Sequence, residues 1–176
     1  MIFTETAIPG AYIVEPELLA DARGFFARTW CQREFEAHGL GPHLAQCNIS
    51  FNAVKGTIRG LHYQAPPCEE AKLIRCTSGA IYDVLVDIRP GSPMFARWSA
   101  LELTADNHRM LYIPEGVAHG FQTLDDNTEV FYQMSERYHA NAARGMRWND
   151  PAFAICWPLD VSLISDRDQS YPDLNP

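Results

Sequence analysis

The chain has 176 residues, a length that suits one domain with a core able to bury most of the surface of the unfolded chain. Hydrophobic residues make up 47% of the chain and charged residues 20%, an ordinary composition for a soluble globular protein. The net charge of −8 argues against nucleic acid as the main partner, although a locally basic pocket could still bind a small anion. We therefore expect a single domain over residues 1–176.

Five cysteines, an odd number, are spread along the chain without a Cys-x-x-Cys pair. This pattern indicates reduced thiols and argues against a disulfide framework or a structural zinc site. The first residues lack the basic region and apolar run of a signal peptide. No segment approaches the ~18 consecutive apolar residues of a membrane span. The sequence thus predicts a cytoplasmic protein that binds neither membrane nor nucleic acid.

The first part of the chain predicts short strands and one helix. Residues 1–20 suit one or two strands, and a turn at residues 21–24 leads into a strand at residues 25–30. Residues 32–38 have a helical composition, and Gly39 stands where a helix C-terminus favours glycine.

Residues 46–51 alternate with a period of two, which places Gln46 and Asn48 on the same face of a strand. The alternation predicts that this face carries polar side chains.

Residues 58–76 combine strand-like composition with several titratable side chains. Two strand-like stretches are joined by a proline-containing connection of the length seen in hairpins and loops. His62 suits a base and Lys72 an electrostatic partner for a developing anion; the structural alternative is a hydrogen-bonded histidine and a solvated lysine on an edge strand. Arg59 and His62 are three residues apart, so a regular strand would point them to opposite faces unless a bulge at Gly60 re-aims one of them.

Short strand candidates recur through the second half of the chain, separated by turns. They lie at residues 80–88, 98–103, 109–113, 118–123 and 129–134. In the first of them, Tyr82, Val84 and Val86 share one face, while Asp83 and Leu85 share the other. Many short strands with almost no helix between them predict an all-β fold, an antiparallel sandwich or barrel. The tail is irregular, with a possible short helix near residues 164–169.

Polar residues on or beside these strands could point into such a barrel. They are Arg23, Gln46, Asn48, Arg59, His62, Lys72, His119 and Tyr132. Cationic side chains at a pocket mouth favour phosphate or another anion, because guanidinium groups match such oxygens in pairs. A histidine and a tyrosine on opposite walls could remove a proton from one face of a carbon and return one to the other face, which inverts a stereocentre.

A metal site is the competing interpretation of the same residues. His62, Glu69, Glu70 and His119 could supply nitrogen and oxygen ligands. A metal-binding barrel of this kind usually presents a His-x-His pair, whereas here the second position is Gln64. The sequence therefore predicts no metal and no cofactor, and a metal-dependent oxygenase built on such a barrel stays open as an alternative.

A series of short motifs runs through nearly the whole chain. They are Asp21-Ala-Arg23-Gly24-Phe-Phe26, Gln46-Cys-Asn48, Arg59-Gly-Leu-His62-Tyr-Gln64, Lys72-Leu-Ile-Arg75-Cys76, Pro114-Glu-Gly-Val-Ala-His119-Gly-Phe, Tyr132, Trp148-Asn-Asp-Pro151 and Ser165-Asp-Arg-Asp168. In this order and spacing they resemble the motifs of the dTDP-4-dehydrorhamnose 3,5-epimerases.

The resemblance implies a cupin-type jelly roll, a homodimer, and metal-free catalysis on a nucleotide-sugar, most simply a dTDP-linked 4-keto-6-deoxyhexose. It carries His62 over as proton acceptor, Tyr132 as proton donor, Lys72 as stabiliser of the enolate oxygen, and Asp168 as the residue that orients His62. It implies a set of substrate-binding residues, with Tyr138 near the base. They are Arg23, Phe26, Arg28, Gln46, Asn48, Arg59, His119, Tyr138 and Arg167.

Two positions depart from the family with a change of charge, and a third departs while keeping its charge. Arg28 and Ala143 stand where the family usually has glutamates associated with substrate binding, and Arg167 stands where a lysine is usual. The catalytic set is intact, so the sequence predicts an epimerase that inverts C3, C5 or both. The alternatives are an enzyme that inverts one centre only or takes another nucleotide, and a sugar-nucleotide binder without activity.

Overall fold

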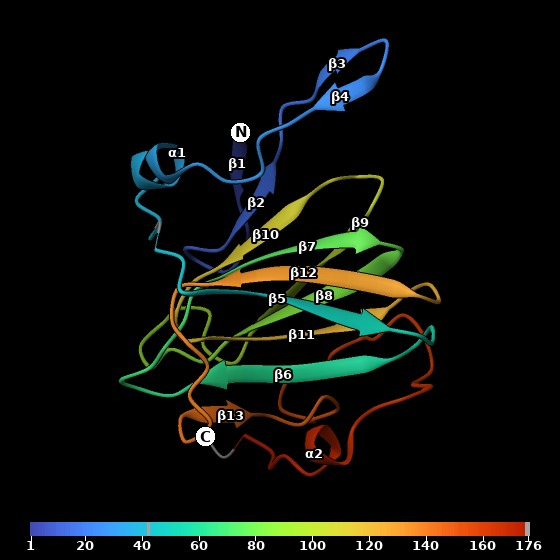
Figure 1. Ribbon diagram of the computed structural model, residues 1–176. Coiled ribbons are helices and arrows are strands. Elements are labelled where there is room, and N and C mark those ends of the chain that lie inside the picture. The colour runs from blue at the N-terminus through green and yellow to red at the C-terminus, as the bar shows by residue number, and fades with distance from the viewer. Residues whose placement is uncertain (42, 175–176) are drawn as a thin grey trace.

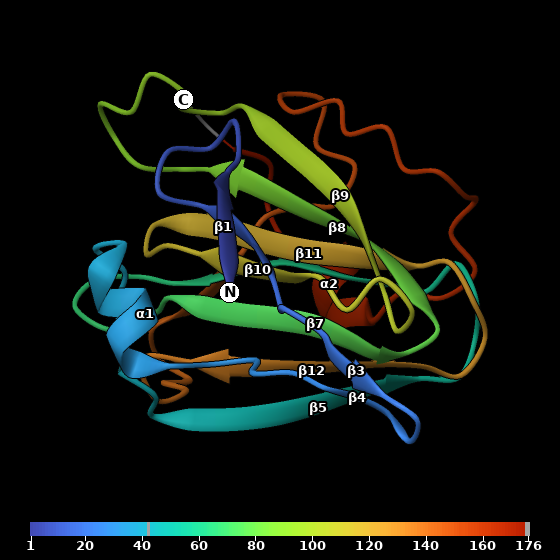
Figure 2. The same ribbon diagram turned by 90° about the horizontal axis from the view of Figure 1, so that it is seen from above.

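Two antiparallel β-sheets face each other across the molecule, and a hairpin projects from one side (Figure 1). The computed structural model describes residues 1–41 and 43–174. Within those residues the structure has thirteen strands and two short helices. The all-β class predicted from the sequence is therefore confirmed, and Figure 2 shows the two sheets as stacked layers.

The strands are distributed between the sheets as follows. The six-stranded sheet has the spatial order β1 (Ile2–Glu5), β2 (Tyr12–Glu15), β10 (Met110–Ile113), β7 (Lys72–Ser78), β12 (Thr128–Met134) and β5 (Gln46–Asn52). The five-stranded sheet has the order β13 (Ala143–Gly145), β6 (Ile58–Gln64), β11 (Val117–Thr123), β8 (Ala80–Asp87) and β9 (Trp98–Thr104). The projecting hairpin pairs β3 (Leu19–Asp21) with β4 (Gly24–Phe26). The helices are α1 (Gln32–Ala37) and α2 (Asp166–Gln169).

Side-chain alternation along β8 builds the core on both faces of the five-stranded sheet. Ile81 and Leu85 point between the sheets, where they pack with Ile74 of β7. Val84 and Val86 point outward, and the C-terminal segment covers them. All four β8 side chains are at most 1% exposed, and full burial of each contributes about 1.5–3 kcal/mol to folding. The inter-sheet core thus closes one part of the barrel and borders the space that remains open.

Helix α1 covers the outer face of the six-stranded sheet. Its Phe35 is 1% exposed and packs with Leu73 and Tyr112. The helix ends at Ala37, and two residues later Gly39 adopts φ +69°. Gly39 N donates to Glu36 O, and Leu40 N donates to Phe35 O. This pair of hydrogen bonds is a Schellman motif, in which the left-handed residue is best served by glycine. The predicted glycine at the helix C-terminus is confirmed.

Strand β6 contains a bulge at Gly60, so the structure decides an alternative that the sequence left open. His62 pairs with His119, but Arg59 pairs with Phe121, so three residue steps of β6 face two steps of β11. Gly60 (φ +130°) provides the extra residue, and a Cβ on it would lie 2.5 Å from the Cα of Gly120. Only glycine permits this approach, and the bulge turns Arg59 and His62 toward the same cavity.

The structure refines one local expectation and corrects two. The connection between the stretches around His62 and Lys72, whose length suited a hairpin or a loop, is a loop, because β6 and β7 belong to different sheets and the connection crosses between the layers. The strand expected over residues 25–30 ends at Phe26, since the following residues lead back toward α1 without a partner strand. The irregular tail contains β13, which is too short to show alternation in the sequence but pairs with β6. No helix among the described residues is long and apolar enough to cross a membrane.

Candidate active site

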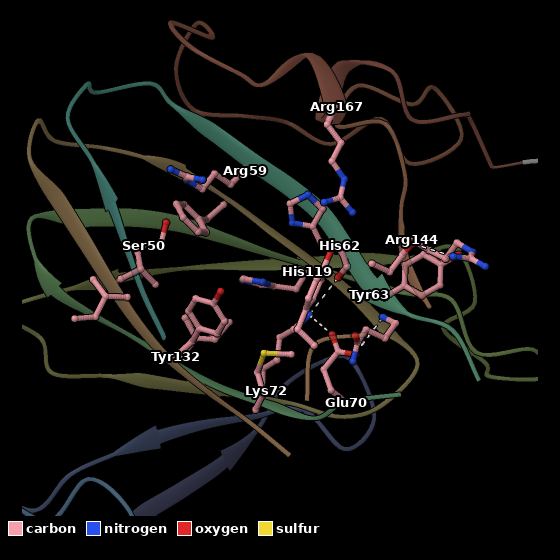
Figure 3. Close-up of a pocket in the computed structure, with 18 of the residues that line it drawn as sticks. Ser50, Arg59, His62, Tyr63, Glu70, Lys72, His119, Tyr132, Arg144 and Arg167 are labelled. Atoms are coloured by element: carbon pink, nitrogen blue, oxygen red, sulfur yellow. Dashed lines mark hydrogen bonds and ion pairs between the residues drawn. The ribbon is translucent and has the colours of Figure 1, made fainter. Parts of the chain in front are cut away.

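A cavity of about 370 Å³ opens between the two sheets, within the range of small-molecule sites (Figure 3). β6, β11 and β13 line it from the five-stranded sheet, while β5, β7 and β12 line it from the other sheet. Arg167 of α2 also lines this cavity. Polar side chains from both layers therefore converge on one space.

His62 lies on β6 and is hydrogen-bonded to a carboxylate from the far end of the chain. Its Nε2 is 2.8 Å from Oδ1 of Asp168, while Oδ2 of Asp168 accepts from Gly60 N at 3.1 Å. Ser165 caps α2 by accepting from Asp168 N, which fixes the carboxylate beside the strand. Burial tends to raise the pKa of Asp168, but the hydrogen bonds from His62, Gly60 and Ser165 lower it below its usual value. An ionised Asp168 can hold the imidazole and stabilise an imidazolium.

Lys72 lies at the start of β7 with its ammonium group buried in the wall of the cavity. Its Nζ is 2.7 Å from Oε1 of Glu70 and donates to His62 O at 3.3 Å. The side chains of Lys72 and Glu70 are 9% and 3% exposed. The predicted alternative, a solvated lysine on an edge strand, is wrong because β7 lies between β10 and β12 and the side chain points inward.

Tyr132 faces the cavity from β12, in the sheet opposite to His62 (Figure 3). Burial raises the pKa of its phenol, although the nearby Arg59 opposes this effect. The phenol therefore carries its proton at neutral pH, as a proton donor must. His62 and Tyr132 thus line one cavity from different sheets, which is the placement that the sequence suggested.

Three arginines lie around the cavity with neutral hydrogen-bond partners. Arg59 donates to Oδ1 of Asn52, and Arg144 donates to backbone carbonyls. Arg167 contacts Tyr138 and lies over the ring of Tyr171. No carboxylate of the described residues pairs with any of the three, so their charges are available to an anion.

Of the other residues expected at the substrate, His119 and Tyr138 line the cavity, whereas Gln46 and Asn48 only contact residues of its wall. His119 of β11 is buried, with Nε2 2.6 Å from Oδ1 of the fully buried Asp83. Gln46 and Asn48 share a face of β5 with Ser50, which lines the cavity, and they contact its wall through Tyr138 and Met134 respectively. Tyr138 lines the cavity while remaining 53% exposed.

The side-chain amide of Gln64 is fully engaged by backbone groups and is not free to bind a ligand in the cavity. Its side-chain amide donates to Cys68 O and Arg137 O, and its oxygen accepts from His139 N. Among residues 1–41 and 43–174, no group of three or more His, Cys, Asp or Glu side chains is arranged to hold a metal ion. Gln64 therefore serves the wall of the cavity.

Comparison with known proteins places the chain and its fold in one family. The family model of dTDP-4-dehydrorhamnose 3,5-epimerase matches residues 5–176. The chain belongs to this family. The enzyme of that name from Shigella flexneri is 44% identical over 93% of this chain and 91% of its own length. The dTDP-4-dehydrorhamnose 3,5-epimerase family thus accounts for nearly the whole chain.

Two solved structures extend the comparison. The Bacillus anthracis dTDP-4-dehydrorhamnose 3,5-epimerase with TDP and PPi bound is 44% identical, with a TM-score of 0.95 over 98% of this chain and 99% of that one. A 3'-monoepimerase from Streptomyces bikiniensis in complex with dTDP-quinovose is 34% identical, with a TM-score of 0.88 over 96% of this chain and 85% of that one. The cupin-type jelly roll is confirmed, and the protein is an isomerase that epimerises a nucleotide-linked 4-keto-6-deoxyhexose. The oxygenase and the inactive binder have no support.

Besides Gln46 and Asn48, three residues that the epimerase resemblance places at the substrate do not line this cavity. Arg23, at the tip of the β3–β4 hairpin, is 90% exposed at its side chain and pairs with Asp21 at 2.6 Å. Phe26 is 68% exposed on the same hairpin. Arg28 donates to Oε1 of Glu34 at 2.9 Å. Figure 1 shows the hairpin extending away from the sheets, so these side chains do not reach the cavity of their own chain.

The second departure from the epimerase family lies in the cavity wall. Ala143 of β13 pairs with Gln64 of β6 and lines the cavity. Its methyl group leaves this part of the wall without the carboxylate that is usual in the family. Arg167, the milder departure, keeps its charge at the cavity.

Several cavity residues were not predicted as site residues. Ser50 follows Gln46 and Asn48 in the same alternation, so the period of β5 could have found it. Glu70 was named only as a possible metal ligand, although it is two residues before Lys72, close enough in sequence to suggest a pair. Arg144 lies in the irregular tail, where no periodic signal exists. Tyr171 lies in the same tail and is not among the residues that line the cavity. Tyr171 nevertheless packs edge-on against His62, with ring centroids 5.9 Å apart.

Proposed function

We propose that this enzyme inverts C3 and C5 of a dTDP-linked 4-keto-6-deoxyhexose in deoxysugar biosynthesis, with His62 as proton acceptor and Tyr132 as proton donor. The observation that carries the proposal is the opposition of these two side chains across one cavity (Figure 3). An acceptor on one side of a carbon and a donor on the other is the arrangement that inversion requires.

The chemistry follows from the 4-keto group of such a substrate. His62 takes the hydrogen of C3 or C5 as a proton, and the electrons of the broken C–H bond move into an enolate whose oxygen is the former carbonyl. Tyr132 then gives its proton to the opposite face of the same carbon, and the carbonyl re-forms. Exchange with solvent removes the proton from His62 and restores the Tyr132 phenol. The step needs no oxidant or reductant, because the carbonyl is present from the start.

Lys72 would stabilise the enolate oxygen. Its ammonium group is buried in the cavity wall, where a charge interacts more strongly than in water. Asp168 would orient His62 through its hydrogen bond to Nε2 and stabilise the imidazolium formed after proton removal.

The nucleotide half of the substrate would bind through the free cations of the cavity. Arg59 and Arg167 suit the diphosphate because their guanidinium groups have only neutral partners. Tyr138 offers an exposed ring near the base, and Gln46, Asn48 and His119 supply polar contacts to the sugar-nucleotide. The TDP named with the Bacillus anthracis relative supports a thymidine nucleotide.

The test is solvent-deuterium incorporation with dTDP- and CDP-linked 4-keto-6-deoxyglucose, read by mass spectrometry and NMR. The expected result is exchange at C3 and C5 of the dTDP compound, unchanged after exhaustive chelation with EDTA. His62→Ala should slow exchange by ~10²–10⁴ while binding of dTDP persists. His38→Ala, a histidine on the outer face near α1, is the matched control. Wild-type exchange rates in His62→Ala would remove His62 from the mechanism.

Inversion of one centre is the second candidate, because the 3'-monoepimerase from Streptomyces bikiniensis shares this fold at 34% identity. Ala143 alters the cavity wall and could change how the sugar sits. The same NMR experiment separates the candidates, since a single-centre enzyme would label C3 or C5 but not both.

A homodimer would place the β3–β4 hairpin where its residues can act. The hairpin exposes Leu19, Phe25 and Phe26, at 66%, 50% and 68%, an apolar surface unusual on an isolated hairpin. Strand β5 also leaves Ile49 and Phe51 exposed at the unpaired edge of its sheet. We infer that the hairpin of each copy covers the cavity of the other and brings Arg23 and Phe26 to the substrate. Sedimentation should give twice the mass of one chain.

The proposed compartment is the cytoplasm. All five cysteines are free thiols in the structure, as a reducing compartment favours. Expression of a fluorescent fusion in intact cells, followed by fractionation, would test this assignment.

A further inference from the structure

Glu70 is a buried carboxylate in the cavity wall that the proton-transfer steps leave without a role. Its side chain is 3% exposed, although a buried charge is costly unless it is paired and hydrogen-bonded. It precedes β7 and lies in the connection that crosses from one sheet to the other. A buried carboxylate beside the cavity suggests that Glu70 has a function at the active site.

Both oxygens of Glu70 are used. Oε1 lies 2.7 Å from Nζ of Lys72, and Oε2 accepts from Gln64 N at 3.1 Å (Figure 3). The carboxylate thus joins the ammonium group of β7 to the backbone of β6. Lys72 Nζ also donates to His62 O at 3.3 Å, a second link to the same strand. Two of the three ammonium hydrogens are therefore engaged, and the third remains for a ligand in the cavity.

The same arrangement holds His62. Asp168 contacts His62 Nε2 with one oxygen and accepts from Gly60 N with the other, at 2.8 and 3.1 Å. Glu70 contacts Lys72 with one oxygen and accepts from Gln64 N with the other. The two carboxylates therefore anchor on β6 two residues before and two residues after His62. Each links one functional side chain to the backbone of a single strand.

We propose that Glu70 is the positioning residue of Lys72, as Asp168 is of His62. It holds the flexible lysine chain so that the ammonium group keeps a fixed place relative to His62 before the substrate arrives. Preorganised charge at the place where an oxyanion develops costs no rearrangement during the reaction. The inference rests on the proposed function, because it assumes that Lys72 stabilises the enolate.

The test compares Glu70→Ala and Glu70→Gln in the wild-type protein and in a Lys72→Met background. The measurements are kcat and KM for deuterium exchange into dTDP-4-keto-6-deoxyglucose. Glu70→Ala should lower kcat by up to roughly 10²-fold with little change in KM, because the ammonium group is misplaced while the nucleotide contacts stay. Glu70→Gln keeps an acceptor for Lys72 and should recover part of this loss. Glu69→Ala removes the adjacent carboxylate, which lines a different depression, and should leave kcat unchanged.

The Lys72→Met background separates positioning from a general structural effect. There Glu70→Ala should cause no further loss of kcat, because its effect passes through Lys72. An equal loss in both backgrounds, or wild-type kcat in Glu70→Ala, would overturn the inference. If Glu70→Ala fails to fold, the same comparison with Glu70→Gln decides. A wild-type rate of exchange in Lys72→Met would overturn the proposed role of Lys72 and this inference together. Slow exchange in Lys72→Met combined with a wild-type rate in Glu70→Ala would overturn the inference alone.

Discussion

At the scale of single residues, the proposed mechanism assigns the removal of one proton and the delivery of another to side chains on different sheets. His62 stands on β6 with an ionised carboxylate behind it, and Tyr132 stands on β12 with a phenol whose pKa is raised by burial. The removal of one proton and the delivery of another can therefore be disabled independently.

Tyr132→Phe should abolish inversion while leaving deuterium exchange measurable. Phenylalanine cannot donate a proton, but His62 can still remove one and return a deuteron to the same face. The expected product is therefore labelled sugar of unchanged configuration, seen as a mass increase without the NMR signals of the epimer. Loss of exchange to the level of His62→Ala would contradict the assignment of separate roles. Tyr63→Phe, on the wall with His62, is the matched control.

At the scale of elements, much of the fold follows from alternation and from turn residues. Gln46, Asn48 and Ser50 share one face of β5 as the period of two requires. The spacing of Arg59 and His62 indicated a bulge, and Gly60 provides it. Asp168 could be connected to His62 only through the resemblance, because 106 residues separate them and no local pattern links a short C-terminal helix to a central strand.

The end of β8 carries a buried carboxylate that ties down the next turn. Asp87 is fully buried and accepts hydrogen bonds from Arg89 and Ser92. Burial tends to raise the pKa of Asp87, but these hydrogen bonds lower it below the usual value. The pKa in the folded state is thus below that of the unfolded chain. The ionised carboxyl therefore stabilises the fold above about pH 4, and this contribution is lost as pH falls through the folded value.

Asp87→Asn should accordingly lower the free energy of unfolding at pH 7 by roughly 1–3 kcal/mol. The difference from wild type should shrink as pH falls below about 4, because the carboxyl of the unfolded wild-type chain then becomes protonated, which favours unfolding until folded Asp87 is protonated as well. Denaturant unfolding at several pH values measures both effects, with the exposed Asp106→Asn as control. A difference that grows on acidification would contradict the direction of the pKa shift.

The two departures from the family belong to different elements and should behave differently. Ala143→Glu places a carboxylate in the cavity wall and should change the ratio of kcat/KM between dTDP- and CDP-linked substrates. Arg28→Glu breaks an exposed pair with Glu34, an interaction worth about 0–1 kcal/mol, and should leave that ratio nearly unchanged. Competition between the two substrates in one reaction measures the ratio directly. A change in the kcat/KM ratio seen only in Arg28→Glu would instead indicate that Arg28 contacts the nucleotide.

At the scale of the whole molecule, the position of the hairpin could not be predicted from one chain. The sequence identified Asp21 to Phe26 as a turn and strand, and the resemblance assigned Arg23 and Phe26 to the substrate. In the structure the hairpin points away from its own cavity. An assembly of two copies would let the hairpin reach a substrate bound in the cavity of the other copy. Whether Arg23 and His62 of one active site come from different copies can be measured.

Subunit mixing provides this measurement. Arg23→Ala and His62→Ala should each lose most of their activity. A mixed dimer would retain one site that combines an intact His62 with an intact hairpin from the other copy. An equal mixture, allowed to re-equilibrate, should therefore regain roughly a quarter of wild-type activity if the copies associate at random. Mixing His62→Ala with Lys72→Met is the control, since both changes lie in the same cavity and no mixed dimer has an intact site. No recovery in the first mixture would place the hairpin outside the partner's site.

The bulge at Gly60 has a consequence for how this site can change during evolution or in the laboratory. Before it and after it, β6 presents its side chains to the cavity in opposite phase, so the number of residues between Arg59 and His62 matters as much as their identity. If β6 became regular at its present length, Arg59 or His62 would turn to the far side of the sheet while the strand itself could still pair. Loss of Gly60 would instead leave these two side chains two residues apart, on one face of a regular strand. Substitutions away from Gly60 leave this phase untouched, whereas insertion or deletion of one residue beyond the bulge would change which side chains of β6 face the cavity.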